Sequence, residues 1–140
     1  MTRILVPTDF SASAHRALKL ARQMVPGAHI KVIHVFDASA AFSPYVDALA
    51  PAYMLEETQD RIRDAAMENL KNVQEEGEEI LFVMGRPADE VLKAARDFGA
   101  DYIFMGTHGR KGLSHFFFGS VAEAVVRASP IPVMIVRDPE

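Results

Sequence analysis

A segment of regularly spaced glycines carries most of the chemistry that this sequence suggests. Gly106-Thr107-His108-Gly109 is followed by nine residues and then by Gly119-Ser120. The segment lies between a short apolar run, Tyr102 to Met105, and a helical pattern. Glycines leave backbone N–H groups accessible to a close-packed anion, and the N-terminus of the following helix adds a partial positive charge. The spacing therefore predicts a site for phosphate groups.

The same residues also have a purely structural interpretation. Gly106 and Gly109 could serve only a tight turn after the strand. Ser120-x-x-Glu123 matches a capping box, in which the serine hydroxyl accepts a hydrogen bond from the helix's own N–H groups. The strand before the glycines and the helix after them favour nucleotide binding over a turn alone. Ser120 is left with both interpretations, a helix cap and a phosphate ligand.

Charged side chains within the glycine segment leave a second alternative open. Arg110 and Lys111 either neutralise phosphate charge or are ordinary solvated loop residues. The histidines show no spacing typical of a metal site. The residues therefore predict no metal ligand from the protein.

A second candidate segment, Pro7-Thr8-Asp9, follows the first apolar run. In open parallel sheets, ligands bind beyond the carboxyl ends of the strands, where the direction of winding reverses. If the strands before Asp9 and before Gly106 are neighbours, the two loops line one crevice. Asp9 would then accept hydrogen bonds from a ribose or a base edge, and Val35 would offer backbone groups and apolar surface to a base. Asp9 could instead be only a turn or cap residue, although we favour the functional role.

These segments need a scaffold, and the sequence predicts an alternation of strands and helices. Short apolar runs alternate with patterns of helical spacing, which predicts parallel strands joined by right-handed crossovers. We expect a single doubly wound α/β domain over residues 1–140, with helices on both faces of a five-stranded sheet. Strands are expected at 4–6, 30–36, 80–84, 102–105 and 133–136. Helices are expected from Ser11 or Ser13 to Pro26, at about 55–74, from Pro87 to a cap at Gly99, and from Ser120. The inward face of the last helix is expected to carry Val121, Ala124, Val125 and Ala128. The stretch Asp37 to Met54 follows no clear period.

Composition narrows the function further. The 140 residues carry a net charge of −4 and contain no cysteine. The negative charge argues against nucleic acid and acidic membranes as partners, and the lack of cysteine excludes disulfides and thiolate chemistry. We see no signal peptide and no apolar run of membrane-spanning length, so a cytoplasmic location is expected.

Several enzyme signatures are absent from the sequence. There is no Walker-type phosphate loop and no G-x-S-x-G nucleophile elbow. No general base is placed beside a nucleophile in any recognisable pattern. We therefore expect a binding protein rather than an efficient enzyme.

The motifs together resemble the universal stress protein family. The glycine pattern G-x2-G-x9-G-S is similar to the family's nucleotide-binding signature, and Ile4 to Ser11 is similar to its opening strand and loop. His34-Val35 resembles the end of the family's second strand, and Gly85-x-Pro87 its third loop. Pro132 to Val136 resembles its last strand, so the likeness covers essentially the whole chain.

The resemblance implies a Rossmann-like domain with strand order 3-2-1-4-5 that binds ATP, or AMP or ADP. A Mg²⁺ or Mn²⁺ ion that accompanies the triphosphate is then expected to be held mainly by phosphate oxygens, with no metal ligand from the protein. The resemblance implies two groups of binding residues: Pro7, Thr8, Asp9 and Val35 around adenine and ribose, and Met105, Gly106, Gly109, Gly119, Ser120 and Val121 around ribose and phosphates. It also implies a homodimer formed through the last strand, Val133 to Val136. Such an edge strand tolerates Pro132 and invites pairing with a second copy.

The function expected from these observations is that of a homodimeric nucleotide sensor in a stress response, with little or no turnover. Two alternatives remain. The first is a protein-interaction module that keeps the glycine loop only for packing and binds no nucleotide. The second is a slow ATPase.

Overall fold

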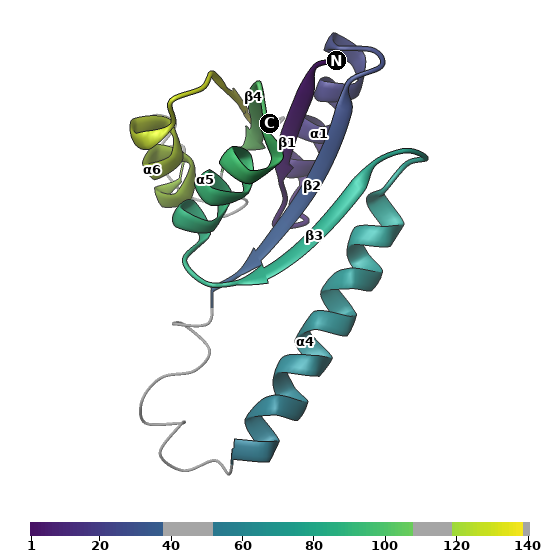
Figure 1. Ribbon diagram of the computed structural model, residues 1–140, viewed down its shortest axis with the longest axis vertical. Helices are drawn as coiled ribbons and strands as arrows, with labels where there is room; N and C mark the ends of the chain where they lie inside the picture. The colour runs from purple at the N-terminus through teal and green to yellow at the C-terminus, as the bar shows by residue number, and fades with distance from the viewer. Residues whose placement is uncertain (38–51, 108–118, 139–140) are drawn as a thin grey trace.

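The computed structural model describes residues 1–37, 52–107 and 119–138, and in residues 52–55 it describes the backbone alone. Strands and helices alternate along this part of the chain (Figure 1). The strands are β1 (Arg3–Pro7), β2 (His29–Phe36), β3 (Glu79–Met84), β4 (Tyr102–Gly106) and β5 (Val133–Val136). The helices are α1 (Ala12–Met24), α4 (Ala52–Val73), α5 (Pro87–Phe98) and α6 (Ser120–Ala128).

The strands form one parallel sheet in the order β3-β2-β1-β4-β5, as predicted. The central strand β1 pairs with β2 on one side and β4 on the other, and its residues Ile4, Leu5 and Val6 are 0 % exposed. A strand covered on both faces must be apolar along its whole length, which explains the short continuous apolar runs in the sequence. The order reverses between β1 and β4, so the predicted neighbours do lie side by side.

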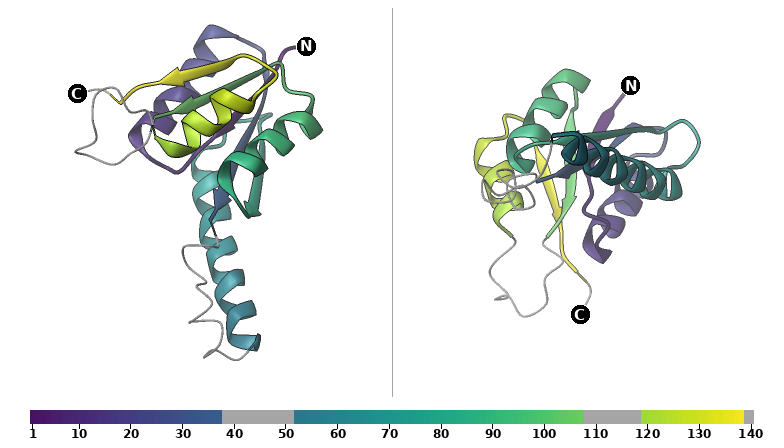
Figure 2. Two further views of the ribbon diagram at one scale, coloured as in Figure 1. Left: turned by 90° about the vertical axis from the view of Figure 1, so that its left-hand side faces the viewer. Right: turned by 90° about the horizontal axis from the view of Figure 1, so that it is seen from below.

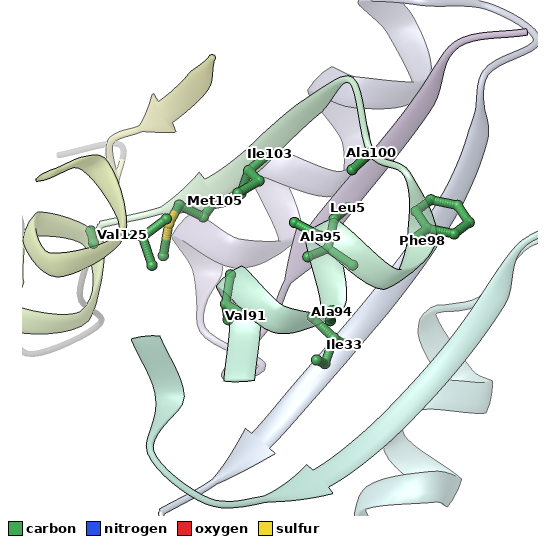
Figure 3. Close-up of a cluster of buried hydrophobic side chains, with 11 residues drawn as sticks. Leu5, Ile33, Val91, Ala94, Ala95, Phe98, Ala100, Ile103, Met105 and Val125 are labelled. Carbon is green, nitrogen blue, oxygen red and sulfur yellow. The ribbon is translucent and has the colours of Figure 1, made fainter. Parts of the chain in front are cut away.

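Helices cover both faces of the sheet. On one face α5 and α6 enclose a core that includes Leu5, Ile103 and Val125 (Figure 3). On the other face lie α1 and α4 (Figure 2). A second core on that face includes Leu18 and Leu70. The molecule is therefore a three-layer α/β fold of the doubly wound kind.

Local signals fix where the helices begin and end. The Ser11 side chain accepts a hydrogen bond from the Ala14 N–H (3.3 Å) and caps α1. Pro87 occupies the first turn of α5, where its missing N–H costs nothing. Gly99 ends α5 in the left-handed region, with φ 68°. The Ser11 cap is one of the two that we predicted for α1, and both signals for α5 are confirmed.

The helix α4 reaches beyond the sheet. Figures 1 and 2 show its N-terminal half extending away from the rest of the molecule. Residues 56–61 are exposed, whereas Ala66 and Leu70 in the C-terminal half are buried against the sheet. Nearly all of the segment that precedes α4, which follows no clear period in the sequence, lies outside the described residues.

The buried face of α6 differs from the prediction. Val125 is 0 % exposed and Val121 is half-buried, as expected, but Ala124 and Ala128 are exposed. Ala122 is buried in their place. The helix has only nine residues, and it packs against α5 and the sheet through a short cluster rather than through a full helical stripe.

Candidate functional site

A pocket of about 730 Å³, its open mouth included, lies at the carboxyl ends of the strands. It stands where the strand order reverses between β1 and β4, the position at which open α/β sheets bind their ligands. Its lining combines residues from all three layers: Pro7, Thr8, Asp9, Ala14, Ile33, Val35, Pro87, Val91, Met105, Gly106, Thr107, Gly119, Val121 and Ala122.

The loop after β1 supplies the polar edge of this pocket. The Thr8 N–H donates to the Ile33 carbonyl (2.8 Å), which extends the pairing with β2 beyond the strand. The Thr8 hydroxyl accepts a hydrogen bond from the Phe10 N–H (3.0 Å). These two bonds fix the path of the chain into α1 and set the direction in which Asp9 leaves the loop.

The Asp9 side chain is exposed, and its carboxylate can both hold the turn and contact a ligand. Its Oδ1 accepts a hydrogen bond from the Ser11 N–H (2.9 Å), which is the turn role that the sequence left open. A carboxylate has several acceptor sites, so this bond leaves room for a ligand hydroxyl or amino group. The turn interpretation and the binding interpretation are therefore compatible.

The apolar part of the pocket comes from the strand ends and two helices. Ile33 and Met105 are buried in the sheet, Val35 is half-buried at the end of β2, and Val91 of α5 is 2 % exposed. A flat apolar ring would fit such a surface, because burial of apolar area provides the affinity while a few polar groups provide the orientation.

At the end of β4 the backbone of two elements meets without a gap. A Cβ atom on Gly106 would lie 2.5 Å from the Ser13 carbonyl carbon and 2.6 Å from the Ala14 nitrogen. The Ser13 hydroxyl, which is fully buried, donates to the Thr107 carbonyl (2.5 Å). Gly106 is thus needed for the close approach of β4 to α1, and Ser13 fixes the first residue after the strand.

The start of α6 corrects the capping-box interpretation of Ser120. Gly119, with φ 87°, is the N-cap, no side chain caps the helix, and Ser120 is the first helical residue. The Glu123 carboxylate pairs instead with Arg127 (Oε1 to Nη2, 2.8 Å). Glycine takes this positive φ without strain, and the cap position lies one residue earlier than a capping box requires.

Most of the predicted site residues meet at this pocket. Eight of the eleven line it: Pro7, Thr8, Asp9, Val35, Met105, Gly106, Gly119 and Val121. Ser120 is exposed beside Gly119 but is not part of the lining. Gly109 and Arg110 lie outside the described residues. The roles of all eleven toward a ligand stay predictions.

Sequence reasoning missed several residues of the site. The pocket is also lined by Ala14, Ile33, Pro87, Val91, Thr107 and Ala122, and the Ser13 hydroxyl holds Thr107 beside it. Pro87 was recognised only as a helix start. A signal for Ser13 did exist, because it is a polar residue at a position where α1 faces the core.

Two negative findings concern the described residues alone. None of their His, Asp and Glu side chains gather in a group of three that could hold a metal ion. No helix among them is long and apolar enough to cross a membrane.

Comparison with known proteins identifies the family and the fold. The sequence profile of the universal stress protein family matches residues 1–137. The chain belongs to the universal stress protein family. Universal stress protein MJ0577 of Methanocaldococcus jannaschii is 32 % identical over 152 residues, which cover 96 % of this chain and 94 % of the relative.

Solved structures share the fold as well. The structure of MJ0577 matches this universal stress protein with a TM-score of 0.82 at 29 % identity, over 99 % of this chain and 97 % of the other. A universal stress protein solved in complex with cAMP matches with a TM-score of 0.62 at 26 % identity, over 99 % and 98 % of the two chains.

Proposed function

We propose that this universal stress protein binds an adenine nucleotide, ATP in the first place, in the pocket between β1 and β4. The observation that carries the proposal is the meeting of the Pro7–Asp9 loop, Val35 and both ends of the glycine segment around one pocket. The loop and Val35 would hold adenine and ribose. Gly106, Gly109, Gly119 and Ser120 would hold the phosphates.

The chemistry of the lining fits such a ligand. The apolar strand ends suit a base, and the N-terminus of α6 with its glycine cap suits a phosphate. The Ser120 hydroxyl is not used as a cap, so it can donate to a phosphate oxygen. A relative of the same fold has been solved with cAMP, which is itself an adenine nucleotide.

The proposed role is that of a sensor with little or no turnover. Asp9 is the one ionisable side chain among the described lining residues, and its Oδ1 already accepts the Ser11 N–H. A Mg²⁺ or Mn²⁺ ion would accompany the triphosphate and be held mainly by its oxygens. Such a site favours binding over activation of a water molecule.

We also propose that the sensor is a homodimer joined through β5. This strand is an edge of the sheet, and the Met134 side chain on it is 37 % exposed. An unpaired edge with exposed apolar side chains favours pairing with an equivalent edge, and a two-fold axis would bring the same surfaces together.

A thermal unfolding experiment tests nucleotide binding. Nucleotide-free protein is heated alone, with ATP and Mg²⁺, with GTP and Mg²⁺, and with inorganic tripolyphosphate. Ligand at 100 times its Kd adds about 2.7 kcal/mol of stability, so ATP should raise the Tm by several degrees and GTP by less. Equal shifts from ATP and tripolyphosphate would contradict a base-binding site, and no shift from any nucleotide would favour the interaction module.

A further inference from the structure

His34 lies just behind the pocket and contacts the loop that carries Asp9. Its Nδ1 is 2.8 Å from the Thr8 carbonyl oxygen. Since a carbonyl can only accept, Nδ1 carries the proton and donates this bond. The imidazole is half-buried at the end of β2 and does not line the pocket.

The same ring supports the next residue of the loop. The His34 and Phe10 rings are 4.7 Å apart between centroids and tilted by 41°, and the His34 and Phe82 rings are stacked at 6.0 Å. Through these two ring contacts His34 joins the β1 loop to β3. Aromatic contacts of this kind stabilise beyond the area that they bury.

The loop needs this support because its backbone is strained. Phe10 has a φ of 64°, the one positive φ among the described residues other than glycine. A bulky side chain rarely adopts this conformation, and it persists only where surrounding contacts enforce it. The conformation turns the chain between Asp9 and the start of α1, so it decides where the Asp9 carboxylate points.

We propose that His34 is a positioning residue for the nucleotide site, which holds Thr8 and Asp9 in their binding geometry through its Nδ1–H bond to the Thr8 carbonyl. The proposal rests on the proposed function for its effect on affinity. Thr8 is fixed from β2 on both sides, because its N–H donates to the Ile33 carbonyl and its carbonyl accepts from His34. Without the His34 bond, the carbonyl end of Thr8 is released and the strained turn can relax.

Three substitutions separate the hydrogen bond from the ring contacts. His34→Ala removes both, and His34→Phe keeps a ring but no donor. His34→Asn keeps a donor, because its amide nitrogen occupies the place of Nδ1. His29→Ala is the matched control, since His29 is also half-buried on β2 but pairs with Glu79 at the opposite end of the strand (Nε2 to Oε2, 2.6 Å).

Adenosine is the probe for the site, because it lacks the phosphates that the glycine segment would bind. Calorimetry should show that His34→Ala and His34→Phe weaken adenosine binding about tenfold, the effect of one lost hydrogen bond. His34→Asn should stay within about threefold of the wild type, and His29→Ala should bind like the wild type. Wild-type affinity in His34→Ala would overturn the proposal, and so would weak binding by His34→Asn with normal binding by His34→Phe.

Amide hydrogen exchange in the ligand-free protein tests the same claim without a nucleotide. The N–H groups of Phe10 and Ser11 are bonded within the loop. They should exchange faster in His34→Ala and His34→Phe than in the wild type and His34→Asn. If the wild type binds neither adenosine nor ATP, the proposed function fails, while the exchange rates still decide whether His34 holds the loop. Equal rates in all variants would refute that role.

Discussion

The Asp9 carboxylate is shared between the protein and the pocket. One oxygen accepts the Ser11 N–H, and the side chain is otherwise exposed at the edge of the pocket. The residue can therefore hold the turn and meet a ligand at the same time. A substitution that removes only one of these two uses would show which of them matters for binding.

Asp9→Asn removes the charge but keeps an oxygen for the Ser11 N–H, whereas Asp9→Ala removes both. We expect Asp9→Asn to weaken ATP binding about tenfold, because an amide is a poorer acceptor than a carboxylate. Its stability should stay within about 0.5 kcal/mol of the wild type. Asp9→Ala should lose affinity to a similar degree and also about 1 kcal/mol of stability.

Calorimetry and urea denaturation of both Asp9 variants measure these effects. If Asp9→Asn bound ATP as the wild type does, Asp9 would be only a turn residue.

Gly106 allows the close approach of β4 to α1. Gly106→Ala would place a methyl group 2.5 Å from Ser13 and 2.6 Å from the Ala14 nitrogen, which is backbone that cannot rotate away. Overpacking of this kind costs about 1–3 kcal/mol. We expect that loss in urea denaturation, together with weaker ATP binding, because β4 and α1 must separate beside the pocket.

Gly85→Ala is the matched control for Gly106. Gly85 follows β3 directly, and the nearest atoms to its added methyl group would belong to the flexible Glu90 side chain, at 2.9 Å. Its loss of stability should be clearly smaller. Equal losses in the two variants would contradict the close approach of β4 to α1 as the reason for the glycine.

Two serines at the two ends of α6 have different partners. Ser120 is exposed at the first position of the helix, and no side chain caps this end. Ser129 follows the last turn, and its hydroxyl donates to the Ile131 carbonyl (2.7 Å) and accepts the Ile131 N–H (3.1 Å). The first hydroxyl is available to a ligand, and the second holds the connection to β5.

We therefore expect opposite results from the two alanine substitutions. Ser120→Ala should weaken ATP binding about fivefold and leave the free energy of unfolding nearly unchanged. Ser129→Ala should lower the free energy of unfolding by about 1 kcal/mol and leave ATP affinity unchanged. A loss of stability in Ser120→Ala without a loss of affinity would restore the capping interpretation that the structure replaces.

Element boundaries were predictable where the signal is local. Ser11, Pro87 and Gly99 act through backbone groups a few residues away, so their types and spacing suffice. The start of α6 at Ser120 was predicted, but its N-cap was misplaced by one residue, because the sequence does not reveal that Gly119 takes a φ of 87°. Contacts between distant segments could not be predicted from the sequence. Ser13 and Thr107 are 94 residues apart, and nothing local to Ser13 indicates its partner.

The whole molecule was more predictable than its details. Five short apolar strands alternating with helices restrict the topology to a parallel sheet with right-handed crossovers. The family resemblance then supplied the strand order, which the structure confirms. The strand order also allowed the pocket to be placed at the β1–β4 junction. Its lining by Ile33, Val91 and Ala122 could not be predicted, because it depends on how the elements pack.

If the dimer forms through β5, a charge on this edge strand should weaken it. Met134→Lys would place a positive charge on the edge strand, and a two-fold axis would bring two such charges together. We expect sedimentation equilibrium to show at least a tenfold weaker dimer. Met24→Lys, at another exposed methionine at the end of α1 (52 % exposed), should leave the dimer unchanged. Equal mass for Met134→Lys and the wild type at all concentrations would place the interface elsewhere.

The most direct test of nucleotide binding is a calorimetric titration of the nucleotide-free protein with ATP and Mg²⁺. The pocket at the β1–β4 junction predicts micromolar binding with one nucleotide per chain. Absence of binding in a well-folded protein, for ATP and equally for AMP, would contradict the adenine-nucleotide site and make this chain an interaction module of the universal stress protein family.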